Sequence, residues 1–223
     1  PHRYHSREDI EISGLLASVI AWGNRKAIIS SGNKLMSLMG DAPFDFIMSH
    51  KARDLERLSG FVHRTFNGQD LSLFIKGLKK IYLQGGMENL FASPISDGSL
   101  RPAIRNFRQA VLATAHEKRS EKHLPDVDKS SAAKRMNMFL RWMVRKDAKG
   151  VDFGIWQNIS PAVLSCPLDV HSGRVARKLG LLTRKQNDAV AVTELDTFLR
   201  KLDPNDPVKY DFALFGLGVF EKF

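Results

Sequence analysis

A lysine and an aspartate, each at the predicted start of a helix, are the residues of this chain best suited to chemistry. Lys134 lies at the start of the amphipathic pattern of residues 132–145, and Asp169 precedes the short basic pattern of residues 170–179. A neutral lysine amine is a nucleophile that forms Schiff bases, and a nearby carboxylate stabilises the positive charge that develops on the attacked group. These two side chains are the minimal equipment for attacking C1′ of a deoxyribose, releasing its base and eliminating the 3′ phosphate.

The predicted position of Lys134 favours the reactive form of its amine. A helix N-terminus carries partial positive charge, which disfavours the ammonium form, and the neighbouring Arg135 and Arg141 act in the same direction. Each of the two residues also has an ordinary interpretation. Taken alone, Lys134 is best explained as a surface lysine that contacts water or phosphate, and Asp169 as a helix N-cap. Their separation in the sequence leaves open whether the two side chains meet.

The elements that must position these side chains are helical, because apolar residues recur at spacings of three and four. Ser6 or Asp9 is the expected N-cap of the first helix, and Ser130 or Ser131 that of the helix carrying Lys134. Asp169 and Gly180 are the expected boundaries of the helix between them. Asn67-Gly68 and Asp97-Gly98 do not lie between convincing strands, so the predicted fold class is all-α. The predicted helices cover residues 12–20, 27–39, 71–82, 104–115, 132–145, 170–179, 193–202 and 209–217.

Positive charge is concentrated in one part of the chain. The 223 residues carry a formal charge of +10, and residues 101–150 hold 13 lysines and arginines against 5 acidic residues, a net charge of +8. A polyanion such as nucleic acid is the expected partner. A solvated face that only maintains solubility is the alternative.

Several classes of protein are disfavoured by composition. Cys166 is the single cysteine, which excludes an internal disulfide framework and a cysteine-ligated cluster. No apolar run is long enough for a membrane span, and no phosphate-cradling glycine loop is present. We expect no cofactor, no metal and a cytoplasmic location. His2 and His5 have a metal-like spacing that is common by chance at a terminus. We find no signal peptide, and because the chain begins at Pro1 rather than Met, a preceding targeting segment stays open.

The segment around Asp169 carries a family resemblance. Residues 167–181, PLDVHSGRVARKLGL, resemble the segment of the helix-hairpin-helix DNA glycosylases that reads approximately V-D-T-H-x-x-R-V-x-x-R-L-G-L. In that family the aspartate is catalytic and also caps its helix, which implies both roles for Asp169. The run KRMNMFLRWM from Lys134 looks like the lysine-bearing helix of the archaeal 8-oxoguanine glycosylase branch. This likeness implies that Lys134 is the Schiff-base lysine. The chain as a whole looks most like an uncharacterised bacterial family carrying this domain.

The resemblance extends less specifically over most of the chain. The opening helix is similar to the first superfamily helix, and Asn24 or Arg25 would be the side chain that fills the gap left by a flipped base. Residues 211–216 resemble the last superfamily helix. The family hairpin reads L-P-G-V-G-x-K-T, whereas residues 124–128 are Leu-Pro-Asp-Val-Asp. Two aspartates would repel a phosphate there, and Lys129, Lys134 and Arg135 would have to compensate.

The resemblance implies two helical lobes around a basic cleft, one of residues 1–25 and 166–223 and the other of residues 26–165. It implies a monomeric DNA glycosylase with abasic-site lyase activity, acting on duplex DNA that contains a damaged base, with an oxidised purine as the first candidate. The alternatives are a non-catalytic nucleic-acid-binding protein of the same fold, for bent or damaged DNA or structured RNA, and a helical interaction protein. The expected catalytic residues are Lys134 and Asp169, and the expected nucleic-acid contacts are Asn24, Arg25, Lys129, Arg135, Arg141, His171 and Arg174.

Overall fold

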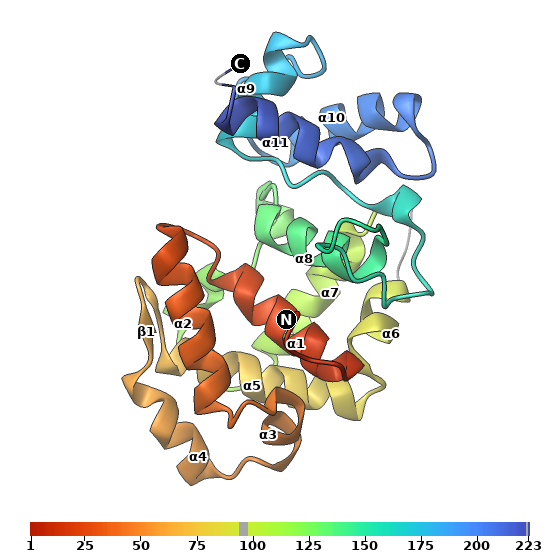
Figure 1. Cartoon of the computed structure of the whole chain (residues 1–223). Helices are drawn as coiled ribbons and strands as arrows, with labels where there is room; N and C mark the ends of the chain where they lie inside the picture. The colour runs from red at the N-terminus through yellow and green to blue at the C-terminus, as the bar shows by residue number, and fades with distance from the viewer. Residues whose placement is uncertain (94–97, 222) are drawn as a thin grey trace. The chain divides into compact units, whose positions relative to one another are not determined.

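The fold is described from a computed structural model and covers residues 1–93, 98–221 and 223 (Figure 1). It is mostly helical, as the sequence predicts, and divides into two compact units. Unit 1 comprises residues 1–90 and 106–124, and unit 2 comprises residues 91–105 and 125–223. None of the described helices is long and apolar enough to cross a bilayer.

Unit 1 is built on helices that follow the predicted periodicity. Ser6 caps the first helix, since its side chain accepts the amide of Asp9, and this confirms one of the two expected caps. The only strands among the described residues are two strands of two residues each, which pair antiparallel as a hairpin. His63 pairs with Phe66, and Arg64 in the turn between them has a φ of +55°. The elements are α1 (Arg7–Val19), α2 (Arg25–Leu38), α3 (Pro43–Ser49), α4 (Ala52–Glu56), η1 (Arg57–Gly60), β1 (Val62–His63), β2 (Phe66–Asn67), α5 (Gly68–Leu83) and η2 (Lys118–His123).

Two helices contribute residues to both units: α6 (Gly86–Ala92) and α7 (Arg101–Leu112). The dipeptide Asn67-Gly68 proves to be a helix start, because the Asn67 side chain caps α5. Of the other dipeptide singled out in the sequence, Asp97 lies outside the described residues.

Unit 2 carries the two candidate catalytic residues. Figure 1 shows α9 and α11 side by side, and these helices pack extensively on each other. Its apolar core includes Cys166, Val175 and Leu195, all fully buried. The elements wholly in this unit are η3 (Val127–Lys129), α8 (Lys134–Val144), η4 (Pro161–Val163), α9 (Val170–Lys178), α10 (Ala189–Leu202), η5 (Pro207–Tyr210) and α11 (Asp211–Val219).

The division into units groups the chain differently from the lobes implied by the resemblance. Residues 1–25 belong to the same unit as residues 26–90, whereas the resemblance groups them with residues 166–223. The glycosylase-like arrangement therefore stays a prediction.

Candidate active site

Lys134 and Asp169 meet in unit 2. The Nζ of Lys134 donates a hydrogen bond to Oδ2 of Asp169 at 2.9 Å. The lysine side chain is 41% exposed and the aspartate side chain 11% exposed, so the lysine is partly exposed and the aspartate mostly buried. The structure thus brings together the two residues that the sequence selected for their chemistry.

The position of Lys134 depends on an unusual turn. Lys134 lies in the first turn of α8, as predicted, but the helix begins at Lys134 itself, and the N-cap is Ala133 and not Ser130 or Ser131. Ser130 and Ala133 both adopt left-handed backbone conformations, with φ of +60° and +49°. The hydroxyl of Ser131 accepts the amide of Ala133, one residue before the helix starts. Because the chain enters the helix through left-handed residues, a serine side chain does not reach the first turn of α8.

Asp169 divides its two oxygens between two tasks. Oδ1 accepts the amides of His171 and Ser172 at 2.8 and 2.9 Å and so caps α9, as the sequence predicts. The Ser172 hydroxyl accepts the Asp169 amide in return, which completes a capping box. Oδ2 remains for Lys134. Burial alone raises the pKa of Asp169, but the hydrogen bonds from Ser172 and Lys134 outweigh burial and hold this pKa below its usual value.

Arg141 was expected to contact nucleic acid, and its location does not allow this in the folded state. The residue is 1% exposed. Its guanidinium pairs with Asp152 at 3.2 Å and with Asp211 at 2.5 Å. It also lies over the ring of Phe212. Arg141 therefore stabilises the interior of unit 2, where its charge is matched by two carboxylates.

The other expected contacts in unit 2 have mixed positions. Lys129 is 83% exposed and lies 3.5 Å from Asp126. Arg135 is half-buried, and burial lowers its pKa. His171 is exposed beside the ring of Phe215, and Arg174 is exposed while donating to the Gly218 carbonyl at 2.6 Å. His171 and Arg174 share α9 with the Asp169 cap, so they are the expected contacts tied most directly to the candidate site.

Asn24 and Arg25 lie in unit 1 at the start of α2. The Asn24 side chain is the N-cap of this helix and accepts the amides of Lys26 and Ala27. Arg25 is exposed at the first helical position. Asn24 thus has a local structural role, whereas the Arg25 side chain is available to a ligand.

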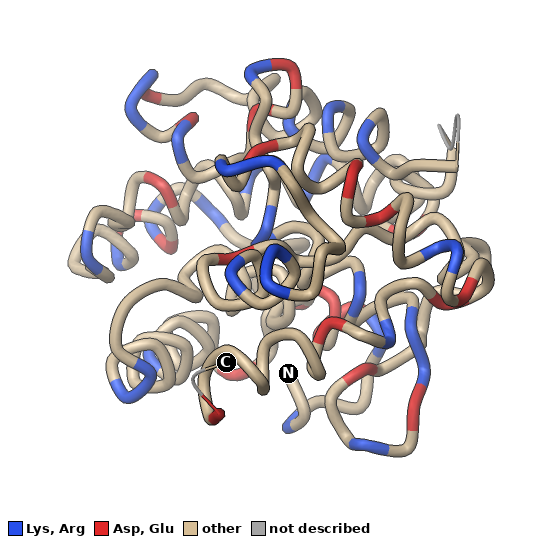
Figure 2. Tube along the Cα trace, turned by 90° about the horizontal axis from the view of Figure 1, so that it is seen from above, with Lys and Arg blue, Asp and Glu red and all other residues tan. Residues whose placement is uncertain are grey.

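Much of the positive charge of residues 101–150 is matched within the fold. Figure 2 shows lysines and arginines interleaved with acidic residues along the trace. Arg105 pairs with Asp128, so the aspartates that replace the hairpin glycines do not stand unmatched beside a phosphate site. Lys118, Lys122, Lys146 and Lys149 are exposed. The basic side chains of this range that bond to carboxylates or carbonyls include Arg101, Arg105, Arg108, Arg119, Lys129, Lys134, Arg141 and Arg145.

The other residues considered for chemistry are mostly buried. Cys166 is fully buried, and burial raises the pKa of its thiol, so a nucleophilic role is disfavoured. In the part of the chain that the structure describes, no three His, Cys, Asp or Glu side chains cluster as metal ligands would. Aromatic side chains could stack on bases if they were exposed, but Phe61, Phe66, Phe74 and Trp156 belong to the core, each at most 1% exposed.

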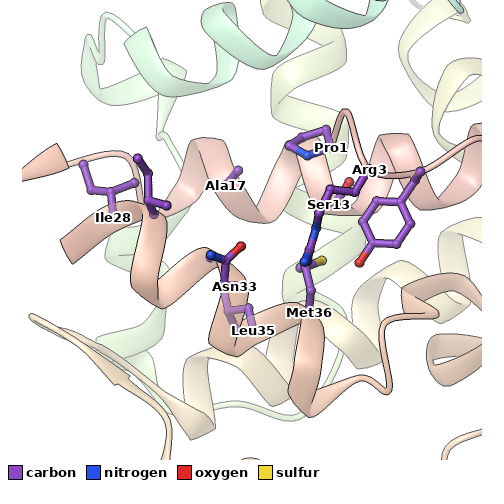
Figure 3. A pocket seen from close by; sticks show the side chains of 11 residues that line it. Pro1, Arg3, Ser13, Ala17, Ile28, Asn33, Leu35 and Met36 are labelled. Carbon is purple, nitrogen blue, oxygen red and sulfur yellow. The ribbon is translucent and has the colours of Figure 1, made fainter. Parts of the chain in front are cut away.

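A separate pocket lies in unit 1, between α1, α2 and the residues that precede α1 (Figure 3). Its volume is about 220 Å³, and its walls are largely apolar. The Tyr4 hydroxyl is buried in this region without a hydrogen-bond partner among the described residues. Neither Lys134 nor Asp169 lines this pocket, so it does not form part of the candidate active site.

Comparison with protein families decides where the chain belongs. Residues 1–220 match the model of a family described as "Protein of unknown function (DUF2400)". The chain belongs to DUF2400. The matched range contains both Lys134 and Asp169, so the candidate site of this DUF2400 member lies inside the family region. Comparison with the curated proteins and with the solved structures finds no significant match.

Sequence reasoning missed the residues that support the pair. Asn187 donates to the backbone carbonyl of Asp169 at 2.9 Å, and Ser172 completes the capping box. Asp211 also lies near the pair. Burial is the larger cause of its raised pKa, and the negative charge of Asp169 raises this pKa further. The capping box has a signal in the sequence, a small hydroxyl residue three positions after Asp169. Asn187 has none, because it reaches the site from a loop.

Proposed function

We propose that this DUF2400 protein is a DNA base-excision glycosylase with abasic-site lyase activity, in which Lys134 is the nucleophile. The observation that carries the proposal is the 2.9 Å contact between the Lys134 amine and the Asp169 carboxylate, made by a lysine side chain that is partly exposed. An oxidised purine is the substrate to test first, following the resemblance of the lysine-bearing helix. An extruded base is required, since the sugar carbon is not accessible inside a duplex.

The chemistry assigns one role to each side chain. The hydrogen bond to Asp169 opens and the amine loses one proton to solvent water before it attacks C1′. The new carbon–nitrogen bond forms as the N-glycosidic bond breaks, and the departing base takes the bonding electrons. Asp169 stabilises the positive charge on the sugar and is placed to accept the proton that the attacking nitrogen sheds. Ring opening leaves an imine, and removal of a C2′ proton then expels the 3′ phosphate.

Trapping of the imine tests this proposal directly. Borohydride reduces the Schiff base to a stable amine, so protein incubated with a lesion-bearing duplex should migrate as a covalent complex. Lys134→Gln should abolish the complex, while Lys201→Gln, at an exposed lysine of α10, should retain it. Trapping that persists in Lys134→Gln would reassign the nucleophile. A wild-type protein that traps no oxidised-purine or abasic substrate would overturn the proposal.

One observation favours a second function, the binding of nucleic acid without catalysis. The Lys134 amine is held by a carboxylate, and attack requires that this contact be broken. If the pair is purely structural, the exposed basic side chains would serve binding alone. Binding that weakens steeply with salt, together with intact strands across a lesion panel, would support this second function.

A further inference from the structure

The segment between α9 and α10 contacts both halves of the candidate site. The Asn187 side-chain amide donates to the backbone carbonyl of Asp169 at 2.9 Å. Two residues later, the Ala189 amide donates to the carbonyl of Ser130 at 3.0 Å. Ser130 begins the left-handed turn that leads into Lys134. Residues 187–189 are therefore hydrogen-bonded both to the turn that precedes Lys134 and to the backbone of the N-cap residue Asp169.

Arg177 fixes the orientation of Asn187. Its Nη2 donates to Oδ1 of Asn187 at 2.7 Å, so the NH₂ group of the same amide faces Asp169. Its Nε donates to the Arg184 carbonyl at 2.7 Å. An arginine that bonds at several points along a loop defines its path more tightly than one contact would, because its planar donors have fixed directions. The side-chain oxygen of Asn187 thus accepts from Arg177, while its NH₂ group donates to Asp169.

Gly173 provides the space for this arrangement. A Cβ at this position would lie 2.8 Å from Oδ1 of Asn187 and 2.9 Å from Nη1 of Arg177. Glycine inside a helix is ordinarily less stable than alanine, and the backbone of Gly173 is helical and does not require it. The absence of a side chain is therefore explained by the close approach of Asn187 and Arg177.

We infer that Asn187 is a positioning residue for the Lys134–Asp169 site, oriented by Arg177 and admitted by Gly173. It fixes the backbone of Asp169 while its neighbour Ala189 fixes the turn before Lys134, and so the loop sets the separation of amine and carboxylate. The catalytic part of this inference rests on the proposed function. The geometric part concerns the amine–carboxylate contact itself and is measurable without any substrate.

Two variants of the full-length chain disturb the loop in different ways, and neither changes its charge. Asn187→Ala removes the hydrogen bond to Asp169. Gly173→Ala keeps Asn187 and displaces it by steric contact, while alanine favours the helix that carries it. Gly216→Ala in α11 is the matched control, since a Cβ there meets nothing within 4 Å. Thermal unfolding of each variant shows whether unit 2 remains folded.

The first readout is an NMR pH titration of the Asp169 carboxyl. The charged groups facing it are Lys134 from α8 and Asp211 from α11. In the wild type its pKa should lie below the ordinary value, and in both loop variants it should rise toward that value as the contact with Lys134 loosens. Gly216→Ala should titrate like the wild type. An unchanged Asp169 titration in a folded Asn187→Ala or Gly173→Ala variant would overturn the inference, whether or not the protein is an enzyme.

The second readout is the single-turnover rate of borohydride-trapped adduct on a duplex with an abasic site. Both loop variants should slow trapping by about ten- to a hundredfold, as expected for a misplacement of reacting groups. Their affinity for the duplex should not change. A wild type that traps nothing would sink the proposed function and leave the titration as the test of the loop. A shifted titration with an unchanged trapping rate would show that the loop does not position the reaction.

Discussion

Lys134 and Asp169 face each other from the N-termini of two helices, with Nζ of the lysine 2.9 Å from Oδ2 of the aspartate. The partial positive charges of α8 and α9 therefore converge on this contact, which favours an anion there. Asp169 is that anion in this structure, and Oδ1 is already bonded to the start of α9. Only the contact through Oδ2 has to change for the amine to become available.

Substitution of Asp169 separates its capping role from its charge. Asparagine is as good an N-cap as aspartate, so Asp169→Asn should keep α9 and alter the free energy of unfolding by less than about 1 kcal/mol through the cap. It removes the negative charge beside Lys134. We expect adduct formation to fall by about 10²- to 10⁴-fold, the range typical of a lost acid–base group. Single-turnover trapping and urea unfolding measure the two effects.

Asp169→Ala is the comparison for that experiment. It removes both cap and charge, so it should cost about 1 kcal/mol more stability than Asp169→Asn. If the asparagine variant traps as fast as the wild type, the carboxylate has no chemical role and Asp169 is only a cap.

Arg141 is the residue whose loss should destabilise unit 2 most. Arg141→Met would leave Asp211 without its guanidinium partner and Asp152 paired with Arg145 alone, and one partner removed from a buried ion pair typically costs 3–5 kcal/mol. Arg105→Met, which breaks an exposed and solvent-screened pair with Asp128, should lower the free energy of unfolding far less. Chemical denaturation compares the two variants. Equal losses would show that the buried network has no special importance.

The sequence predicted the longer helices and selected Lys134 and Asp169, because the signals for these are local, but it did not predict the short helices α3, α4 and α6. The apolar spacing of α8 and the aspartate before α9 are visible in a few consecutive residues. The resemblance also selected Lys134 and Asp169 together, and the structure shows that the two side chains touch. The N-cap of α8 was predicted wrongly, since left-handed backbone at Ser130 and Ala133 has no signal in non-glycine residues.

Long-range ion pairing could not be predicted from composition. Arg141 looks like one more basic residue on a basic helix, yet its partner Asp211 is 70 residues away in the chain. Asn187 likewise reaches Asp169 across 18 residues. A net-charge argument treats an arginine such as Arg141 as surface charge, whereas in the structure it forms ion pairs in the interior of unit 2. Partners of this kind depend on tertiary packing and not on spacing along a helix.

Asp196 should make stability depend on pH. Burial raises the pKa of this carboxyl to about 6, against the smaller lowering effects of the Cys166 amide and Ser165. The unfolded chain loses this proton near pH 4, so the free energy of unfolding should fall as the pH rises from about 4 to 6 and remain lower above that. Asp196→Asn keeps an acceptor for the Cys166 amide and cannot ionise.

We therefore expect Asp196→Asn to be more stable than the wild type at pH 7, by up to about 3 kcal/mol, with the difference vanishing near pH 4. Urea unfolding at the two pH values checks this. A variant that is less stable at pH 7 would mean that the ionised carboxylate contributes more through its hydrogen bonds than its burial costs.

Gly77 of α5 should not tolerate a side chain, although it lies within a helix. A Cβ there would lie 2.9 Å from both Cα and Cγ1 of Val111, in the part of α7 that belongs to unit 1. Overpacking of this kind costs about 1–3 kcal/mol, so Gly77→Ala should lower the unfolding free energy despite the higher helix propensity of alanine. Gly32 of α2 is the matched control in the same unit, because a Cβ there meets nothing within 4 Å. Gly32→Ala should be stabilised by about 0.5–1 kcal/mol. Thermal and urea unfolding of the pair should give shifts of opposite sign, and shifts of the same sign would contradict the close α5–α7 approach at Gly77.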